Sequence, residues 1–400
     1  MSCADSTTLE PIRSPKETLV RLVKRTLDQI HPPVGALDHF LDEVEDILDV
    51  AQGAPAYPTA PSIVERVREV AVSPDGGRYT DGRGLAALRE ALAEDLSRDY
   101  QTEIPVGNVL ITAGSNQGFC LVASALAEPG DEVIVPVPFY FNHDMWIRLE
   151  GLIPVYVETS PSTGQVVVDD VAAKVSPRTR IIVVTSPGNP TGVAASPDLI
   201  EDLADLARER ELVLVLDETY RSFRADCSPS HRIFARSDWS EHVVSLHSFS
   251  KDFAIPGYRV GAVIGSPLLL DEVMKLLDCV AICAPRIGQE AALEGLRSAG
   301  EWRRQKAREV ALKHERFRTV MSRSPGGFEL ELSGGFYGWV RHPEPVGATD
   351  AVVQRLVTDC GVLAITGAVF TPEDRGFLRF SFANLDLAQV DEMARRLERF

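Results

Sequence analysis

The sequence predicts an α/β protein with a large, doubly wound and mostly parallel sheet, joined to a smaller α+β domain. Short continuous apolar runs alternate with amphipathic helical stretches from about residue 61. Such runs are typical of strands that are buried on both faces of a parallel sheet. The 400 residues are enough for two packed domains. After about residue 290 the strands alternate more, and the order of elements becomes that of an α+β unit.

The first two thirds of the chain carry the signals of the large sheet. Residues 1–30 predict a loose arm that runs into a helix. IVERVREV predicts the next helix, and Ser62 with Glu65 has the spacing of a capping box after Pro61. A later helix has Ser196 as its predicted cap and Pro197 in its first turn. The predicted strands of the large sheet are 109–112, 133–137, 181–185, 212–216, 243–246 and 260–264.

The last quarter of the chain predicts a different pattern. A charged stretch at 301–318 predicts an exposed helix, and a final helix is expected to end at Phe400. Between them we expect strands at 328–332, 336–340, 362–365 and 377–382, a turn at Gly334-Gly335 and a helix near 350–359. We therefore expect a large domain at 53–289 and a small domain made of 1–52 and 290–400. A ligand cleft should lie between them, at the carboxyl ends of the strands.

Composition excludes several function classes. Lys plus Arg is 41 and Asp plus Glu is 58, a formal charge of −17, which disfavours binding to nucleic acid or to an anionic membrane. No apolar run approaches the roughly 18–20 residues of a membrane span, and MSCADSTTLE lacks the features of a secretory signal. The six cysteines form no CxxC pair, so we expect reduced thiols, a cytoplasmic location and no metal site.

The segment SFSKDFAIPGYRVGAV follows a predicted strand and carries Lys251 between hydroxyl side chains. It is compatible with an ordinary solvated loop. A lysine held in a cleft is also the residue that forms a Schiff base with a carbonyl cofactor. Ser248, Ser250 and Arg259 would then donate hydrogen bonds to a phosphate group.

Three further strand ends carry polar residues. LVLVLDETY ends in Asp217 and Tyr220; the acid suits a helix cap or salt bridge, or a partner that keeps a pyridine nitrogen protonated. TSPGNPTG contains Asn189, either in a plain turn or as a hydrogen-bond donor, with Tyr220, to a phenolic oxygen. ITAGSNQGF turns through Gly114 into a helix beginning near Ser115, and a helix N-terminus is a phosphate site.

Together these motifs resemble one family. GSNQ, PFY, SPGNPTG, DETY, SFSK, GYRVG and RFSF occur in the order typical of the class I/II aminotransferases of fold type I, which use pyridoxal 5'-phosphate. The resemblance extends from about residue 50 to the C-terminus. It implies a PLP-dependent enzyme that moves the amino group of an L-amino acid to a 2-oxo acid.

The resemblance also implies roles for individual residues. Lys251 is similar to the lysine that forms the internal aldimine and moves the α-proton, and Asp217 matches the partner of the pyridine nitrogen, with His143 supporting it from behind. Asn189 and Tyr220 match the pair on the ring hydroxyl. The residues that match the phosphate site are Ser115, Asn116, Ser248, Ser250 and Arg259. Tyr140 is placed where an aromatic ring stacks on the cofactor.

Substrate and partner residues follow from the same resemblance. Arg379 in FLRFSFA matches the arginine that binds the substrate α-carboxylate, and its planar fork of donors suits that task. Gly53 in VAQGAP would present its backbone to the same carboxylate, although the Ala-Pro-Ala after it departs from the family pattern. Tyr79 looks like the tyrosine that reaches the phosphate of a neighbouring subunit, which implies a homodimer with shared active sites.

Two other functions remain open at this level. The same site residues serve elimination, decarboxylation, cyclisation or oxidation of an amino acid in relatives of this family. A non-catalytic sensor would need a DNA-binding domain, which neither the N-terminal arm nor the charge provides. Asp38 and Asp42 would favour a cationic substrate if they border the pocket, but a solvated helix face is the preferred interpretation.

Overall fold

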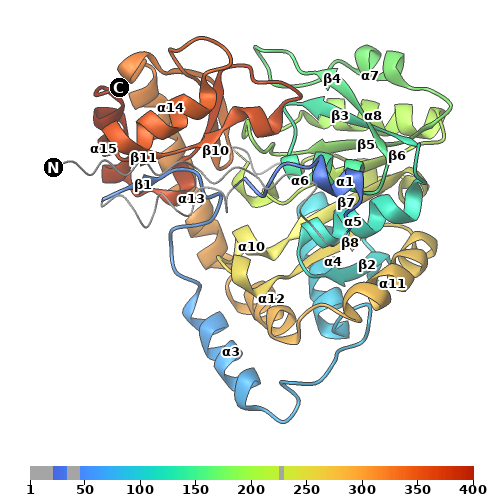
Figure 1. Ribbon diagram of the computed structural model, residues 1–400. Coiled ribbons are helices and arrows are strands. Elements are labelled where there is room, and N and C mark those ends of the chain that lie inside the picture. The colour runs from blue at the N-terminus through green and yellow to red at the C-terminus, as the bar shows by residue number, and fades with distance from the viewer. Residues whose placement is uncertain (1–20, 34–45, 225–228) are drawn as a thin grey trace.

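The computed structural model describes residues 21–33, 46–224 and 229–400. Its centre is a seven-stranded sheet with the strand order β2-β8-β7-β6-β5-β3-β4 (Figure 1). The strands are β2 (Val109–Thr112), β3 (Glu132–Val137), β4 (Ile153–Glu158), β5 (Thr179–Thr185), β6 (Val213–Asp217), β7 (Val243–Ser248) and β8 (Gly261–Ile264). All six predicted strands are present, with ends that differ by at most two residues.

Strand directions agree with a mostly parallel sheet. Strands β3 to β7 pair in parallel, whereas β8 is antiparallel to both of its neighbours, β2 and β7. Strand β4 was not predicted. It pairs only with β3, at the edge of the sheet, and Ile153 at its start is exposed. Residues 152–157 (LIPVYV) nevertheless form a continuous apolar run like those of the central strands, and Pro154 within it is tolerated because β4 is an edge strand.

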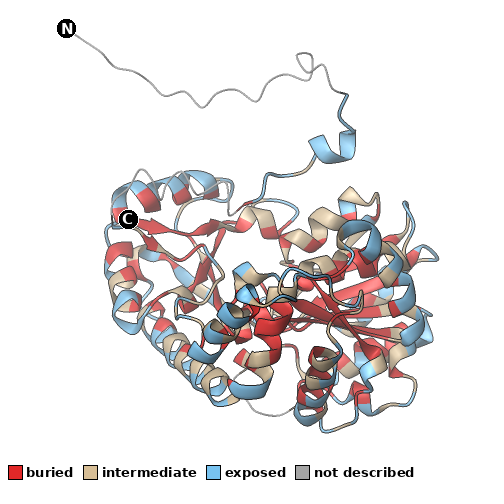
Figure 2. Ribbon diagram, turned by 90° about the horizontal axis from the view of Figure 1, so that it is seen from below, coloured by how far each residue is buried: buried red, intermediate tan, exposed pale blue. Residues whose placement is uncertain are grey.

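Helices cover both faces of this sheet, as a doubly wound fold requires. One face packs against α5 (Ser115–Leu126), α6 (Phe141–Leu149) and α11 (Pro267–Ala281). The other packs against α4 (Ala86–Tyr100), α7 (Val168–Lys174), α8 (Pro197–Glu209), α9 (Trp239–His242) and α12 (Arg286–Ser298), with α3 (Pro61–Val72) beside α12. Figure 2 shows the strands buried between helices whose outer faces are exposed.

The two predicted helix caps have different outcomes. Ser196 caps α8, because its side chain accepts a hydrogen bond from the Leu199 N–H at 3.2 Å. The capping box at Ser62 is wrong. Helix α3 begins one residue earlier, at Pro61, with Ala60 as its N-cap and no side-chain cap. The fixed φ of proline suits the first helical position, which leaves Ser62 inside the helix.

A second core surrounds a four-stranded sheet with the order β12-β13-β10-β9. Its strands are β9 (Glu329–Gly334), β10 (Tyr337–Arg341), β12 (Ile365–Thr366) and β13 (Phe377–Ser381). The helices around it are α13 (Gly300–Met321), α14 (Thr349–Arg355), which continues as a π-turn at Leu356–Cys360, and α15 (Leu387–Leu397). The predicted 362–365 strand is divided into β11 (Val362–Leu363) and β12, and the last helix ends before Phe400.

The N-terminal segment joins this second core. Strand β1 (Leu48–Asp49) pairs in parallel with β11, while α1 (Lys24–Leu27) is a single exposed turn. Helix α13 connects the two cores, because Trp302 near its start packs on the large sheet's helices and Phe317 near its end lies in the second core. No helix in the described parts of the chain has both the length and the hydropathy that a membrane crossing requires.

Short turns of helix complete the fold. They are α10 (Phe249–Asp252) and the 3₁₀ segments η2 (Val106–Asn108), η3 (Arg221–Phe223), η4 (Ile233–Ala235), η5 (Pro256–Tyr258), η6 (Pro325–Gly327), η8 (Gly367–Phe370) and η9 (Phe382–Asn384). Helix α10 directly follows β7, and η3 begins a few residues after the end of β6, so both lie beside the strand ends.

Candidate active site

A cavity of about 190 Å³ lies at the carboxyl ends of the large sheet, where the second core approaches it. Strands β5, β6 and β7 each end in a residue that lines it: Thr185, Asp217 and Ser248. Parallel strands end at one edge of a sheet, so residues far apart in sequence meet there. Every residue assigned from the sequence to the cofactor or the substrate lines this cavity except Tyr79, and His143 lies outside its lining.

One wall of the cavity has the donors that a phosphate group needs. Helix α5 begins at Ser115, after Gly114 in a left-handed conformation (φ 86°). The Ser248 hydroxyl accepts a hydrogen bond from the Ser250 N–H at 3.2 Å and so orders the start of α10. Arg259 donates to the carbonyl oxygens of Pro256 at 2.8 Å and Ala113 at 3.3 Å. The helix N-terminus and the guanidinium therefore face one point.

Close packing makes a glycine necessary in this wall. A Cβ at Gly114 would lie 2.5 Å from Arg259 Nη2. That position therefore requires glycine both for its φ and for the approach of the arginine. This cradle fits the phosphate of the cofactor that the resemblance implies.

Asp217, at the end of β6, is held from two directions. Its Oδ1 accepts a hydrogen bond from the Thr219 N–H at 3.1 Å, and its Oδ2 lies 3.2 Å from His143 Nε2. Both side chains are buried. The sequence-based expectation that His143 supports Asp217 agrees with this contact. A carboxylate fixed in this way suits a partner that must stay protonated, such as a pyridine nitrogen.

Asn189 and Arg379 form a pair across the two cores. Arg379 Nη1 donates to Asn189 Oδ1 at 2.9 Å, and Nη2 donates to the carbonyl oxygen of Ala51. The Asn189 amide N–H₂ is thereby directed away from Arg379. Arg379 Nε is buried with no hydrogen-bond partner among the described residues. A buried unpaired donor in a cleft is typical of a group that awaits a ligand.

Lys251 follows Ser250 on α10 and lies partly buried in the cavity wall. Burial, together with the positive charges of Arg379 and Arg259, lowers the pKa of its amine from 10.5 to about 8. More of the amine is therefore neutral near physiological pH than for a solvated lysine. A neutral amine is the form that attacks a carbonyl carbon.

Tyrosines line the remainder of the cavity. Tyr140 precedes α6, and burial raises the pKa of its hydroxyl to about 12, although a hydrogen bond with Asn116 acts in the opposite direction. Tyr220 and Tyr337 face each other with their hydroxyl oxygens 2.5 Å apart. The sequence analysis places Tyr337 in a strand and gives it no role in the site. The signal that could have identified it is the aromatic pair FY, which directly follows Gly334-Gly335.

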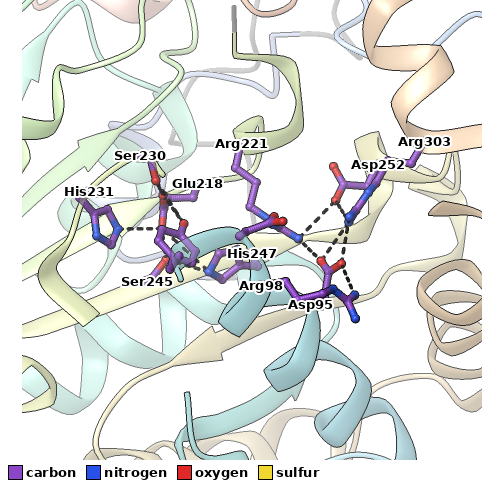
Figure 3. A network of polar contacts seen from close by, with 12 residues as sticks. Asp95, Arg98, Glu218, Arg221, Ser230, His231, Ser245, His247, Asp252 and Arg303 are labelled. Carbon is purple, nitrogen blue, oxygen red and sulfur yellow. Dashed lines mark hydrogen bonds and ion pairs between the residues drawn. The ribbon is translucent and has the colours of Figure 1, made fainter. Parts of the chain in front are cut away.

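Behind the cavity lies a buried network of charged residues (Figure 3). Asp95 on α4 accepts two hydrogen bonds from Arg303 at 2.9 and 3.0 Å and one from Arg221 at 2.6 Å. Asp252 lies 3.5 Å from Arg303 and 3.8 Å from Arg221. Because Arg221 follows Tyr220 and Asp252 follows Lys251, the network holds the backbone on which two site residues are mounted.

A second part of Figure 3 centres on Glu218. Its carboxylate accepts hydrogen bonds from the hydroxyls of Tyr100 at 2.6 Å, Ser230 at 2.8 Å and Ser245 at 2.6 Å. Burial favours its neutral form, but His231, His247 and the hydrogen bond from Ser245 outweigh that effect and hold the pKa of Glu218 well below its usual range. Neither this cluster nor the Asp95 network was predicted from the sequence.

Three further predictions concern Gly53, Tyr79 and the pair Asp38 and Asp42. Gly53 lines the cavity, and a Cβ there would lie 2.1 Å from Tyr337 Oη. Tyr79 is 75% exposed in the connection between α3 and α4 and does not reach the cavity of its own chain. Asp38 and Asp42 lie outside the described residues. Within the described ranges, no group of three or more His, Cys, Asp or Glu side chains is arranged to hold a metal ion.

Known proteins resemble this chain over almost its whole length. The sequence model of the family described as aminotransferase class I and II matches residues 45–397. The chain is 30% identical over 385 residues to YugH of Bacillus subtilis, which carries the name of an aminotransferase. The match covers 94% of this chain and 97% of YugH. It is 29% identical to the aspartate aminotransferase of Pyrococcus horikoshii, covering 94% of this chain and 95% of that protein.

Solved structures agree with the sequence relatives. The crystal structure of aspartate aminotransferase from Thermotoga maritima superposes with a TM-score of 0.83 at 27% identity, covering 94% of this chain and 99% of that one. The cavity described above also contains the donor set that the cofactor of this family needs. The chain belongs to the class I and II aminotransferases, and it is a pyridoxal-phosphate-dependent enzyme of fold type I.

Proposed function

We propose that the cavity at the carboxyl edge of the large sheet is the active site of this aminotransferase and that Lys251 is its catalytic lysine. The observation that carries the assignment is the convergence of Lys251, Asp217, Asn189 and Arg379 on one cavity, from segments up to 190 residues apart. Pyridoxal phosphate, when bound, supplies the electron sink for the electron pair of the substrate Cα–H bond.

The residues around the ring keep that sink effective. Asp217, oriented by His143, would hold a proton on the ring nitrogen, because a nearby carboxylate favours the charged ring. Asn189 and Tyr220 would hold the ring oxygen, and Tyr140 would contact the ring. The phosphate would be held by Ser115 and Asn116 at the start of α5, together with Ser248, Ser250 and Arg259.

The residues around the substrate position it and move its proton. Arg379 binds the α-carboxylate, with the backbone of Gly53 beside it. These contacts would hold the substrate in the cavity that Lys251 also lines. The Lys251 amine, with its pKa lowered to about 8, removes the α-proton and later returns a proton. A general base is most effective when its pKa is near the working pH.

We propose an L-amino acid and a 2-oxo acid as substrates, without assigning the side chain. Relatives carry names for different substrates: the Pyrococcus horikoshii protein is an aspartate aminotransferase, and a protein of Arabidopsis thaliana, 27% identical over 94% of this chain and 95% of its own length, is an aromatic aminotransferase. The α-carboxylate and α-amino group are common to both classes. Arg379 and Lys251 are the residues that would recognise them.

The test is to mix the purified holoenzyme with single L-amino acids and no 2-oxo acid. The visible absorbance of the cofactor should be lost in a single turnover and should return when a 2-oxo acid is added. The Lys251→Ala variant should show neither change. Continuous product formation without a 2-oxo acid would contradict amino-group transfer and indicate elimination, decarboxylation, cyclisation or oxidation.

We also propose a homodimer in which Tyr79 reaches the phosphate site of the second copy. The side chain is 75% exposed on the monomer surface, so it is free to contact a second copy. The pairing of β1 with β11 supports a small domain made of 1–52 and 290–400, beside a large domain at 53–289.

The unpaired Cys120, Cys279, Cys283 and Cys360 support a cytoplasmic location.

A further inference from the structure

Tyr337 lies at the floor of the cavity, at the start of β10, and is 1% exposed. Its hydroxyl oxygen is 2.5 Å from that of Tyr220. The guanidinium carbon of Arg379 lies 4.6 Å from the centre of its ring. The backbone of Gly53 covers the same hydroxyl so closely that a Cβ there would be 2.1 Å away. This buried phenol therefore contacts the tyrosine assigned to the cofactor and the arginine assigned to the carboxylate.

A count of protons gives the direction of the hydrogen bond between the two phenols. Each tyrosine hydroxyl has one proton to donate and lone pairs with which to accept. The proton of Tyr220 is needed for its hydrogen bond to the ring oxygen of the cofactor. In the loaded enzyme Tyr220 must then accept from Tyr337. The result is a chain of donors that runs from Tyr337 to Tyr220 to the ring oxygen.

The surroundings of the two hydroxyls keep both protonated near neutral pH. Burial raises the pKa of Tyr220 well above its usual value, and it also raises the pKa of Tyr337. The groups that face Tyr337 are Tyr220 and Asp217 at the end of β6 and Arg379 on β13, while Tyr140 before α6 faces Tyr220. The positive charge of Arg379 over the ring favours donation by the Tyr337 hydroxyl.

We propose that Tyr337 is a positioning residue that strengthens the hydrogen bond from Tyr220 to the cofactor ring oxygen. A hydroxyl that accepts a hydrogen bond becomes a better donor, by about 10–30% per bond in condensed-phase estimates. Stronger donation stabilises negative charge on the ring oxygen. It thereby lowers the pKa of the nitrogen atom that joins Lys251 to the cofactor. The inference rests on the proposed role of Tyr220.

The experiment is a pH titration of the visible absorbance of the holoenzyme for four proteins: wild type, Tyr337→Phe, Tyr220→Phe and the double variant. The midpoint of the absorbance change gives the spectral pKa, which is the pKa of the nitrogen that joins Lys251 to the cofactor. Tyr337→Phe should raise this spectral pKa by roughly half a unit, which is about threefold in proton affinity. Tyr220→Phe should raise it more. The double variant should match Tyr220→Phe alone, because Tyr337 has no path to the ring oxygen without Tyr220.

A structural control separates this role from simple packing. Val340→Ala removes buried volume from the same strand without touching a hydroxyl, so it should lower the urea midpoint and leave the spectral pKa unchanged. Tyr337→Leu, which lacks the same oxygen, replaces Tyr337→Phe if the latter does not bind cofactor.

The outcomes separate this inference from the site assignment. If Tyr220→Phe leaves the spectral pKa unchanged, the proposed role of Tyr220 is wrong. If Tyr220→Phe raises it while Tyr337→Phe leaves it unchanged or lowers it, the Tyr337 proposal alone is overturned. A rise in the double variant equal to the sum of the two single rises would also overturn it, because independent effects add.

Discussion

The amine of Lys251 has two neighbours of like charge and little water. The ammonium form loses solvation and is repelled by Arg379 and Arg259, while the neutral form is unaffected. The pKa of about 8 therefore controls when the amine can attack a carbonyl group.

This value predicts the pH dependence of cofactor capture. Only the neutral amine reacts, so the rate at which cofactor-free enzyme binds pyridoxal phosphate should rise with pH and level off above about pH 8. Stopped-flow absorbance from about pH 6 to about pH 10 measures this rate. A rate that was still rising at about pH 10, as for a lysine with the usual pKa of 10.5, would contradict the prediction. Lys251→Ala should show no capture at any pH, and an exposed-lysine variant, Lys275→Met, should behave like wild type.

Arg379 supplies the second prediction at this scale. Its guanidinium is 2% exposed, and truncating one partner of a buried charge pair costs on the order of 2–5 kcal/mol. Arg379→Met should therefore lower kcat/KM for amino acids far more than for amines that lack a carboxylate. Arg375→Met is the matched control, because Arg375 pairs with Glu158 at the surface. Equal losses for both substrate classes would remove Arg379 from carboxylate binding.

At the level of elements, the start of α13 is attached to the large sheet's helices by charge. Arg303 bridges Asp95 on α4 and Asp252 on α10 (Figure 3). Removing it leaves Arg221 as the remaining buried arginine beside both carboxylates, and breaking a buried ion pair typically costs about 3–5 kcal/mol. Among the described residues, the neighbouring Arg304 pairs only with Glu301, on the exposed face, and such pairs contribute about 0–1 kcal/mol.

We expect Arg303→Met to lower the free energy of unfolding by several kcal/mol and Arg304→Met to leave it nearly unchanged. Urea unfolding followed by fluorescence measures both. Similar values for the two variants would show that the buried network adds no more stability than a surface ion pair.

Helix starts give a smaller prediction at the same scale. Ser196→Ala removes the cap of α8 and should cost about 0.5–2 kcal/mol. Ser62→Ala should cost little, because α3 begins at Pro61 and Ser62 only contacts the Ser298 hydroxyl at 3.0 Å. The same urea experiment distinguishes them. A larger loss for Ser62→Ala would restore the capping box that the sequence suggested.

At the level of the whole molecule, the position of Tyr79 predicts a shared site. If Tyr79 acts on the second copy, each site takes its lysine and its tyrosine from different chains. Mixing inactive Lys251→Ala with an inactive Tyr79 variant should then restore activity, because a mixed dimer has one site with neither defect. Subunit exchange is confirmed by mass spectrometry of tagged chains. Exchange without recovered activity would place Tyr79 outside the partner's site.

The sequence by itself determined the parts of this protein that depend on local patterns. Continuous apolar runs revealed the central strands, since both faces of each strand are buried. The motifs around Lys251, Asp217 and Asn189 each lie at one strand end, where the chain turns toward the cleft. Their order along the chain identified the family, and the family model confirms that identification.

Only the tertiary structure decided the features that depend on residues distant in sequence. The position of β4 at the sheet edge and the antiparallel direction of β8 depend on which strands pair with each other in the sheet. Tyr337 faces Tyr220 across 117 residues, and Arg303 faces Asp95 across 208. A local pattern reports whether a side chain is buried, because burial follows the period of its own strand or helix. It does not report which side chain it meets there, because that contact exists only once the two cores have packed together.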